Sequence, residues 1–171
     1  ADTERVAHWR RLLADAGPAP KVGLLWKSAV TAGHRHRYFS PFEQWAPVLL
    51  TPGVAFVNLQ YGDCEAELEQ ARRDLGVEIW SPPGIDLKKD LDDVTALACA
   101  MDLVIGFSNA TFNLGAAAGA PSWLISAPGA WPRLGLTETY AWYPQARVFV
   151  PDAYQAWGPV FDRIAGDLAA R

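Results

Sequence analysis

Short, nearly continuous apolar segments alternate with segments of helical periodicity along the whole of this 171-residue chain. Such apolar segments fit strands that are buried on both faces of a sheet. We expect strands at Lys21–Trp26, Val54–Leu59, Val77–Trp80, Leu103–Phe107, Ser122–Ser126 and Arg147–Val150. Strands that alternate with helices need crossover connections, which make the sheet parallel. The pattern predicts one doubly wound α/β domain over residues 1–171, with a mainly parallel sheet and helices on both faces.

Helical spacing, glycine and proline mark the segments between these strands. Gly17 and Gly76 stand where a helix ends, Pro41 stands in the first turn of another helix, and Asp90 or Asp92 is placed to cap a further one. The helices are expected at Thr3–Ala16, Ser40–Leu50, Glu65–Leu75, Leu91–Met101, Thr111–Ala118 and Asp152–Ala170, with an irregular stretch over residues 127–145.

Composition and charge argue against several classes of protein. Hydrophobic residues make up 50% of the chain and charged residues 20%, which is enough to bury a core. The net charge of −4 argues against nucleic-acid binding, which needs a clustered basic face. Gly, Pro and Ser interrupt the long uncharged stretch Leu114–Pro132, so no membrane span is expected. The amino terminus has no apolar leader, and Cys64 and Cys99 are expected to be reduced thiols in a cytoplasmic protein.

Open parallel sheets bind ligands beyond the carboxyl ends of their strands. This rule selects the segments Lys27–Arg37, Gln60–Cys64, Pro82–Asp93, Ser108–Asn113 and Pro128–Trp142. Aromatic residues of the last segment, among them Trp131 and Trp142, fit either a wall of a ligand pocket or a plug under the sheet.

The segment after the first strand gathers the permanent cations Lys27, Arg35 and Arg37, with His34 and His36 between them. Three cations suit a phosphate or a diphosphate, which Arg binds with forked hydrogen bonds and Lys binds as a point charge. A solvated basic loop is an equal alternative.

The segment after the fourth strand puts Ser108, Asn109 and Thr111 at the start of a helix. Unpaired backbone N–H groups and the helix dipole favour an anion at such a place. These residue types are also common helix caps, so the segment alone favours capping over ligand binding.

Other sites are not indicated by the sequence. Neither the phosphate loop GxxxxGK[ST] nor the dinucleotide fingerprint GxGxxG is present, and Gly106–Ala110 lacks the second glycine of the hydrolase motif GxSxG. His34 and His36 have no Cys or carboxylate at ligand spacing. Asp90, Asp92 and Asp93 fit a helix start better than a magnesium site. No metal site is predicted.

Four segments of the chain together carry a family resemblance. They are VGLLWKSA with an Arg-containing loop behind it, SPFEQWAPVLLTPGVAFVNLQYGDC, DLDDVTALACAMDLVIGFSNATFNLGAAAGAPSWLI, and WYPQARVFVP. In this order they resemble the carboxyl-terminal, nucleotide-sugar-binding half of GT-B glycosyltransferases. The chain looks most like the glycosyltransferase domains that follow tetratricopeptide repeats in bacterial proteins, akin to the heptosyltransferase and O-GlcNAc-transferase groups.

The resemblance implies transfer of a sugar from a nucleoside diphosphate sugar to a hydroxyl acceptor, with no obligatory metal or other cofactor. Lys27 and Ser28 resemble the loop that approaches the donor diphosphate, and Arg35 or Arg37 resembles the basic residue that neutralises it. Lys27, Arg35 and Arg37 are therefore the catalytic candidates. The matching positions imply these donor-binding residues: Ser28, Gln60, Tyr61, Lys88, Asp93, Ser108, Asn109, Thr111 and Asn113.

The same resemblance implies a partner for the domain. The general base of GT-B enzymes generally comes from the other half, so we expect an amino-terminal acceptor-binding or tetratricopeptide domain in a longer chain. A protein is one acceptor to consider. The sequence leaves open the nucleotide base and the sugar of the donor, and the oligomeric state.

The helix start departs from the family pattern. Relatives commonly read D-T-x-x-x-H-L there, where this chain has Ser108 in place of the Asp and Asn113 in place of the His. The departure favours an alternative function: a non-catalytic, degenerate glycosyltransferase-fold module for nucleotide sensing or protein interaction. The retained basic loop favours a working donor site. A sugar-nucleotide epimerase using His34 or His36 is a weaker alternative.

Overall fold

The structure is a computed structural model and describes residues 1–28 and 38–171. The described part of the chain contains one seven-stranded sheet with the order β3-β2-β1-β4-β5-β7-β6. All neighbouring strands are parallel except β6 and β7. The strands are β1 Lys21–Leu25, β2 Ala55–Asn58, β3 Ile79–Trp80, β4 Leu103–Phe107, β5 Ser122–Ile125, β6 Thr139–Tyr140 and β7 Tyr143–Phe149.

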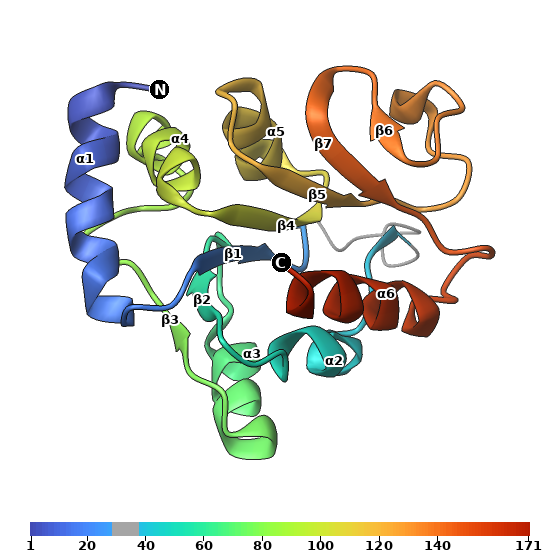
Figure 1. The fold of residues 1–171 in the computed structure, drawn as a ribbon, viewed down its shortest axis with the longest axis horizontal. Helices are drawn as coiled ribbons and strands as arrows, with labels where there is room; N and C mark the ends of the chain where they lie inside the picture. Colours follow the sequence, from blue (N-terminus) through green and yellow to red (C-terminus); the bar gives the residue numbers. More distant parts are fainter. Residues whose placement is uncertain (29–37) are drawn as a thin grey trace.

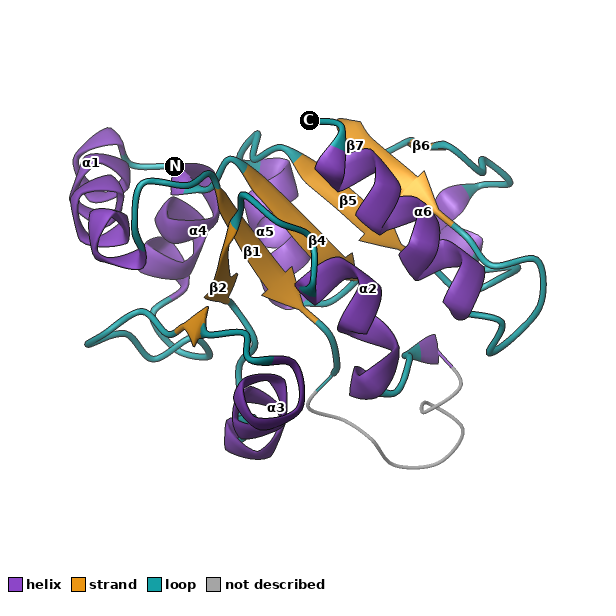
Figure 2. Ribbon diagram, turned by 60° about the horizontal axis from the view of Figure 1, so that its bottom comes forward, coloured by secondary structure: helices purple, strands orange, loops and turns teal. Residues whose placement is uncertain are grey.

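Helices cover both faces of this sheet (Figure 1). On one face lie α1 Thr3–Leu12, α4 Leu91–Ala100 and α5 Ala110–Ala117, which pack side by side. On the other face lie α2 Ala46–Leu49, α3 Glu65–Gln70 and α6 Gly158–Ala169, with α2 against α6 (Figure 2). Short 3-10 segments at Leu13–Ala16, Phe42–Trp45 and Trp131–Arg133, and a π-helical segment at Ala71–Leu75, extend or precede these elements. The predicted doubly wound α/β fold is confirmed.

Each face of the sheet buries its own apolar cluster. Trp26, Trp45 and Phe161 belong to the cluster beneath α2 and α6, and Trp9 and Phe112 belong to the cluster beneath α1, α4 and α5. All five residues of β1 are buried because this strand lies in the middle of the sheet. A central strand covered on both faces explains why its sequence is continuously apolar rather than alternating.

Helix ends follow the expected side-chain chemistry in part. The Asp2 carboxylate caps α1 by accepting the backbone N–H of Arg5 at 2.9 Å. Gly76 ends the π-helical segment in the left-handed conformation, with φ of 67°. Of the two predicted cap residues of α4, Asp90 stands at the N-cap position, but its carboxylate accepts the N–H of Asp86 at 2.8 Å and makes no cap bond with the helix.

Two sequence predictions near the carboxyl terminus are also wrong. Residues 127–145 are not irregular throughout, since they include β6 and the start of β7. Pro144 and polar neighbours hid this strand, which tolerates them because it lies near the edge of the sheet. The last helix begins at Gly158 rather than Asp152, and Pro159 occupies its first turn.

The contact between β1 and β4 depends on a glycine. Gly106 lies opposite Leu25 in the parallel register. A Cβ atom at position 106 would collide with the Leu25 Cβ and lie 2.5 Å from the Leu25 carbonyl oxygen. Neither atom belongs to a flexible side-chain end, so the two strands approach this closely only with glycine at position 106.

We expect Gly106→Ala to lower the free energy of unfolding by about 1–3 kcal/mol, because overpacking forces the strands apart. Gly166→Ala is the matched control: position 166 lies inside α6 with no atom within 4 Å of a new Cβ. That control should gain about 0.5–1 kcal/mol from helix propensity. Urea denaturation measures both, and equal stability of the two variants would contradict the close approach.

Candidate functional site

The order of the strands reverses at β1: β2 and β3 are added on one side of it, and β4 and β5 on the other. The helix that follows β1 in the sequence, α2, lies on one face of the sheet, and α5, which follows β4, lies on the other (Figure 1). At such a switch point the diverging loops leave a crevice at the carboxyl edge of the sheet. The predicted segments at Lys27–Ser28 and Ser108–Asn113 therefore start at neighbouring strand ends.

The Gln60 side chain fixes the end of β1. Its Oε1 atom accepts the backbone N–H groups of Trp26 at 3.1 Å and Lys27 at 2.9 Å. Its Nε2 atom donates to the Tyr61 carbonyl at 2.9 Å, and its own N–H donates to Asn58 Oδ1 at 2.8 Å. Gln60 is 1% exposed. The side-chain oxygen replaces the backbone carbonyl that a neighbouring strand would offer to these N–H groups. It thereby joins the loop after β2 to the loop after β1.

A cavity of about 480 Å³ opens on one side of this connection. We call it the β1–α6 cavity, because it lies between the end of β1 and the segment that leads into α6. The residues lining it are Lys27, Ser28, Phe39, Ser40, Pro41, Gln44, Gln155 and Trp157. Most of its surface is apolar, with a few polar groups, as is usual for small-molecule sites.

A second, more open cavity of about 700 Å³ lies on the other side, at the ends of β2 and β3. We call it the β2–β3 cavity. Its polar lining includes Asn58, Gln60, Ser81, Asp86 and Lys88, and its remaining lining comes from Tyr61, Gly62, Cys64, Pro82, Gly84, Ile85, Leu87 and Asp90. Gln60 lines this cavity and Lys27 lines the first one, so the hydrogen bond between them forms the boundary of both.

The Lys27 ammonium already has a partner. Its Nζ atom forms an ion pair with Glu67 Oε1 on α3, and both side chains are partly buried, 29% and 20% exposed. The predicted cation is therefore present at the strand end, but a carboxylate offsets its charge.

The turn between β4 and α5 is organised by two asparagines. Asn109 caps α5, its Oδ1 atom accepting the N–H of Phe112 at 3.0 Å. Asn113 Nδ2 donates to Ser108 Oγ at 3.1 Å and to the Asn109 carbonyl at 2.7 Å. The residues at the two positions that depart from the family pattern thus bond to each other. Thr111 is 2% exposed, which places it in the core rather than at the surface of the turn.

Two predicted donor-binding residues separate in space: Lys88, which lies before α4, and Asp93, which lies in the first turn of α4. Lys88 lines the β2–β3 cavity, and its N–H donates to the Asp86 carboxylate at 2.9 Å. This backbone bond is the main cause that lowers the pKa of Asp86, with smaller contributions from Lys89. Asp93 instead pairs with Arg5 and accepts the Trp9 indole N–H at 3.2 Å, so it lies in the contact between α1 and α4, outside both cavities.

The catalytic candidates Arg35 and Arg37, like His34 and His36, lie outside the described residues. In the segment Pro128–Trp142, Trp131 and Trp142 are exposed, and neither lines the two cavities. Tyr140 is buried against the core, where burial raises the pKa of its hydroxyl and a hydrogen bond with Ser108 partly offsets the rise. Within this segment, Tyr140 contacts the turn between β4 and α5 through Ser108.

Sequence reasoning missed the wall that Gln44, Gln155 and Trp157 contribute to the β1–α6 cavity. Gln44 lies in the predicted helix Ser40–Leu50. Gln155 and Trp157 lie in the predicted helix Asp152–Ala170, which is longer than the observed α6. The Gly158-Pro159 pair was the available signal: it starts α6 late and leaves a loop after β7, at the carboxyl edge of the sheet. Gln155 in that loop has a left-handed φ of 66°, a strained conformation for a residue with a Cβ.

Two polar atoms of this wall lack partners. Trp157 Nε1 and Gln44 Oε1 are buried and have no hydrogen-bond partner among the described residues. The nearby Trp45 indole, by contrast, donates to Ser40 Oγ at 3.0 Å. An unsatisfied buried polar group costs about 1–3 kcal/mol, so these two atoms are a local cost to the stability of the packing beside the cavity.

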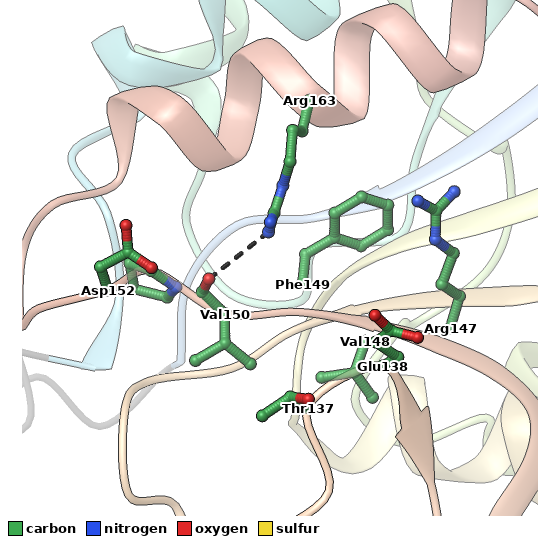
Figure 3. Close-up of a pocket in the computed structure, with 9 residues that line it drawn as sticks. Thr137, Glu138, Arg147, Val148, Phe149, Val150, Asp152 and Arg163 are labelled. Atoms are coloured by element: carbon green, nitrogen blue, oxygen red, sulfur yellow. Dashed lines mark hydrogen bonds between the residues drawn. The ribbon is translucent and has the colours of Figure 1, made fainter.

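A third cavity, of about 440 Å³, lies beside β7 near the far edge of the sheet (Figure 3). Arg147 and Arg163 both extend along the ring of Phe149 there, with guanidinium carbons 4.6 and 5.7 Å from its centroid. Arg147 pairs with Asp167 at 2.7 Å, and Arg163 Nη2 donates to the Val150 carbonyl at 3.4 Å. Both side chains hold α6 against β7. Packing of the fold therefore explains why two cations lie beside this cavity, and no ligand is needed to explain them.

Residues 1–28 and 38–171 hold neither a cluster of metal ligands nor a membrane-spanning helix. Within these ranges no three His, Cys, Asp or Glu side chains converge as a metal ion would require. Nor does any helix there have the length and apolar character needed to cross a membrane. Both cysteines are unpaired, and burial raises the pKa of each thiol.

No family model matches the chain. The chain is similar to Protein FlbA of Caulobacter vibrioides, with 59% identity over 167 residues. The match takes in 98% of this chain but only 28% of FlbA. The chain therefore spans less than a third of the length of this relative.

Two solved structures share the fold. The ADP-heptose LPS heptosyltransferase II of E. coli matches 99% of this chain and 51% of its own, with a TM-score of 0.66 and 13% identity. A glycosyl transferase family 9 protein of Veillonella parvula matches 87% of this chain and 40% of its own, with a TM-score of 0.56 and 18% identity. The chain has a glycosyltransferase-like fold and matches 51% of the one neighbour and 40% of the other.

We expect Gln60→Met to lower the free energy of unfolding by about 1–3 kcal/mol, because the N–H groups of Trp26 and Lys27 lose their shared acceptor. Gln70→Met, at a half-buried position on α3, is the control and should change stability by less than about 0.5 kcal/mol. Urea denaturation gives both values. Indistinguishable variants would mean that Gln60 does not hold the end of β1.

Proposed function

We propose that this domain binds a nucleoside diphosphate sugar at the carboxyl edge of β1, β2 and β3, as the donor-binding half of a glycosyltransferase. One observation carries the proposal: two cavities meet at the hydrogen bond between Lys27 and Gln60, at the switch point of the sheet. A donor of this class has two bulky ends joined by a diphosphate, and it needs two pockets with a polar boundary between them. The fold shared with the two glycosyltransferases supports the same reading.

In this proposal the nucleoside occupies the β2–β3 cavity. Asn58, Ser81 and Asp86 offer hydrogen-bonding groups there, and Ile85 and Leu87 offer apolar surface. A nucleoside needs both, since its base is flat and weakly polar and its ribose carries hydroxyl groups. The Asp86 carboxylate accepts the N–H groups of Lys88 and Lys89 and pairs with the Lys89 ammonium at 3.2 Å, and these contacts lower its pKa and hold it in place at the cavity.

The diphosphate crosses the end of β1. Lys27 and Ser28 line the adjoining cavity, and α5 starts at the neighbouring strand end. Arg35 and Arg37, which follow in the sequence, are proposed to supply the remaining positive charge. Backbone N–H groups and cations at such an edge stabilise a diphosphate without a metal ion.

The chemistry is glycosyl transfer. The bond between the anomeric carbon and the diphosphate oxygen breaks, a bond from the acceptor hydroxyl oxygen to that carbon forms, and a general base takes the hydroxyl proton. Negative charge develops on the departing diphosphate, where the cations of the β1 loop would stabilise it. The base and the acceptor, a protein hydroxyl among the candidates, are proposed to come from a separate acceptor-binding or tetratricopeptide domain.

A second candidate function is a non-catalytic module that senses nucleotides or contacts a protein. Two observations favour it. Glu67 offsets the charge of Lys27, and Ser108 and Asn113 bond to each other at the positions where relatives carry Asp and His. A neutralised lysine and a turn without charged side chains are the features expected of a site that binds a nucleotide without catalysing its turnover.

Calorimetric titration of the purified protein separates the two candidates from a protein with no donor site. The probes are UDP, GDP, ADP and CMP, each also as a nucleotide sugar, with ADP placed first because the E. coli neighbour is an ADP-heptose enzyme. A selective response supports the donor site, and sugar release by the full-length protein then distinguishes transferase from sensor. No heat with any nucleotide would refute the proposal.

We expect Glu67→Gln to tighten nucleoside diphosphate binding about three- to tenfold at low salt, because it frees the charge of Lys27. The control is Glu69→Gln on the same helix, whose partner Arg72 is largely exposed. Because such surface pairs contribute little, that variant should bind as the parent does. Calorimetry measures both, and weaker binding by Glu67→Gln would contradict the role given to Lys27.

We expect the double variant Arg35→Ala and Arg37→Ala to reduce turnover by the full-length protein about 10² to 10³-fold with little change in its melting temperature. Removing cations that face a leaving group costs transition-state stabilisation rather than packing. Arg72→Ala with Arg73→Ala, both exposed after α3, is the control and should keep full turnover. Equal rates in the parent and the first double variant would refute the assignment.

A further inference from the structure

Four large apolar side chains project into solvent from the segment that connects β5 with β7, and we call them the Trp131 patch. Trp131 is 78% exposed, Leu134 63%, Leu136 41% and Trp142 57%. The segment leads into β6, at the opposite end of the sheet from β3 (Figure 1). Leu134 has a left-handed φ of 52°, which is strained for a residue with a Cβ, so the loop holds this side chain in solvent at a cost. Single exposed apolar residues are common, but several in one short segment mark an interaction surface.

Hydrogen bonds hold the segment that carries the patch in one conformation. The buried Arg133 guanidinium donates to the Leu136 carbonyl at 2.5 Å and to the Ala127 carbonyl at 3.3 Å, which closes the loop from the inside. The Trp142 indole N–H donates to the Pro132 carbonyl at 2.8 Å and so joins the two ends of the patch. The patch is therefore ordered before any partner arrives, which lowers the entropy that binding must overcome.

The patch can be covered without removing an unpaired charge from water. Residues 127–142 contain two charged side chains, and one of them, Arg133, is already buried with its guanidinium on backbone carbonyls. The other, Glu138, is not one of the four patch residues. The Trp142 indole N–H already has its acceptor, so a dry contact over this ring costs no hydrogen bond. The chemistry of the patch fits an apolar, uncharged partner surface.

The same patch on a second copy of this chain has that chemistry. The chain has a net charge of −4, so two copies repel each other overall, whereas the four patch residues carry no charge. A two-fold contact brings the same patch of both copies together and is complete after two chains. The adjoining edge strand β6 consists of Thr139 and Tyr140 alone, which is too short to extend the sheet, so side chains make the contact.

The exposed area of the patch suffices for a weak dimer. Two tryptophans and two leucines at these exposures offer on the order of 500 Å² of surface per copy. Two copies would together bury about 1,000 Å², which is the lower limit for a specific interface. Tryptophans near the centre of a contact supply much of its binding energy. An interface of this size and composition is expected to associate in the micromolar to submillimolar range.

We propose that the Trp131 patch is a dimer interface, in which it packs against the same patch of a second copy of this chain. None of its four residues lines the β1–α6 cavity or the β2–β3 cavity. The inference therefore goes beyond the proposed donor-binding function and does not depend on it.

Sedimentation velocity of the purified chain, from about 5 to about 500 µM, tests the interface over the range expected for a weak contact. The parent should pass from monomer to dimer within this range. The double variant Trp131→Gln and Leu134→Gln should raise the dissociation constant at least about tenfold, because polar side chains replace apolar contact area. Both side chains are exposed, so the melting temperature of this variant should change little.

Leu50→Gln is the matched control. Leu50 is 57% exposed at the end of α2, outside the patch, and its variant should dimerise as the parent does. The dimer should also persist from about 0.05 to about 0.5 M salt, because salt screens ionic contacts and not apolar ones. A parent that stays monomeric at the highest concentration would overturn the proposal and leave the patch to another domain or another protein. Dimerisation of the double variant with the affinity of the parent would overturn it as well, and so would loss of the dimer at high salt.

Discussion

The buried amide of Gln60 is the interaction on which the rest of the site depends. Its oxygen accepts two successive N–H groups at the end of β1, and its other contacts fix the loop after β2. Backbone donors left free at a strand end must find a partner, and here one side chain supplies it. The arrangement holds Lys27 at the boundary of two cavities and gives both cavities a shared, rigid wall.

Charge is balanced closely around this boundary. Lys27 is matched by Glu67, and the turn before α5 carries the neutral pair Ser108 and Asn113. An anion that binds here gains less from direct ion pairing with Lys27 than it would from an unpaired cation, and more from backbone N–H groups. Such a site favours a ligand with extended contacts at both ends over a free phosphate.

The fold could be predicted well from the sequence because strands buried on both faces are continuously apolar. The hairpin of β6 and β7 could not, since Pro144 and its polar neighbours interrupt the apolar pattern of β7, which lies next to the edge strand. For the candidate site, the strand-end rule placed Lys27 and Gln60 at the carboxyl edge of the sheet, where both line cavities, but Asp93 instead pairs across α1 and α4. It also missed Trp157 as a cavity residue, because membership of a pocket depends on tertiary packing that no local pattern records.

Backbone amide NMR during a nucleotide-sugar titration tests the central claim most directly. A donor that spans the sheet edge should shift the amide signals of Lys27, Ser28 and Gln60 together with those at the ends of β2 and β3, and should leave the signals around Arg147 in place. Shifts confined to the cavity beside β7, or none at a ligand concentration that saturates the calorimetric response, would contradict the account.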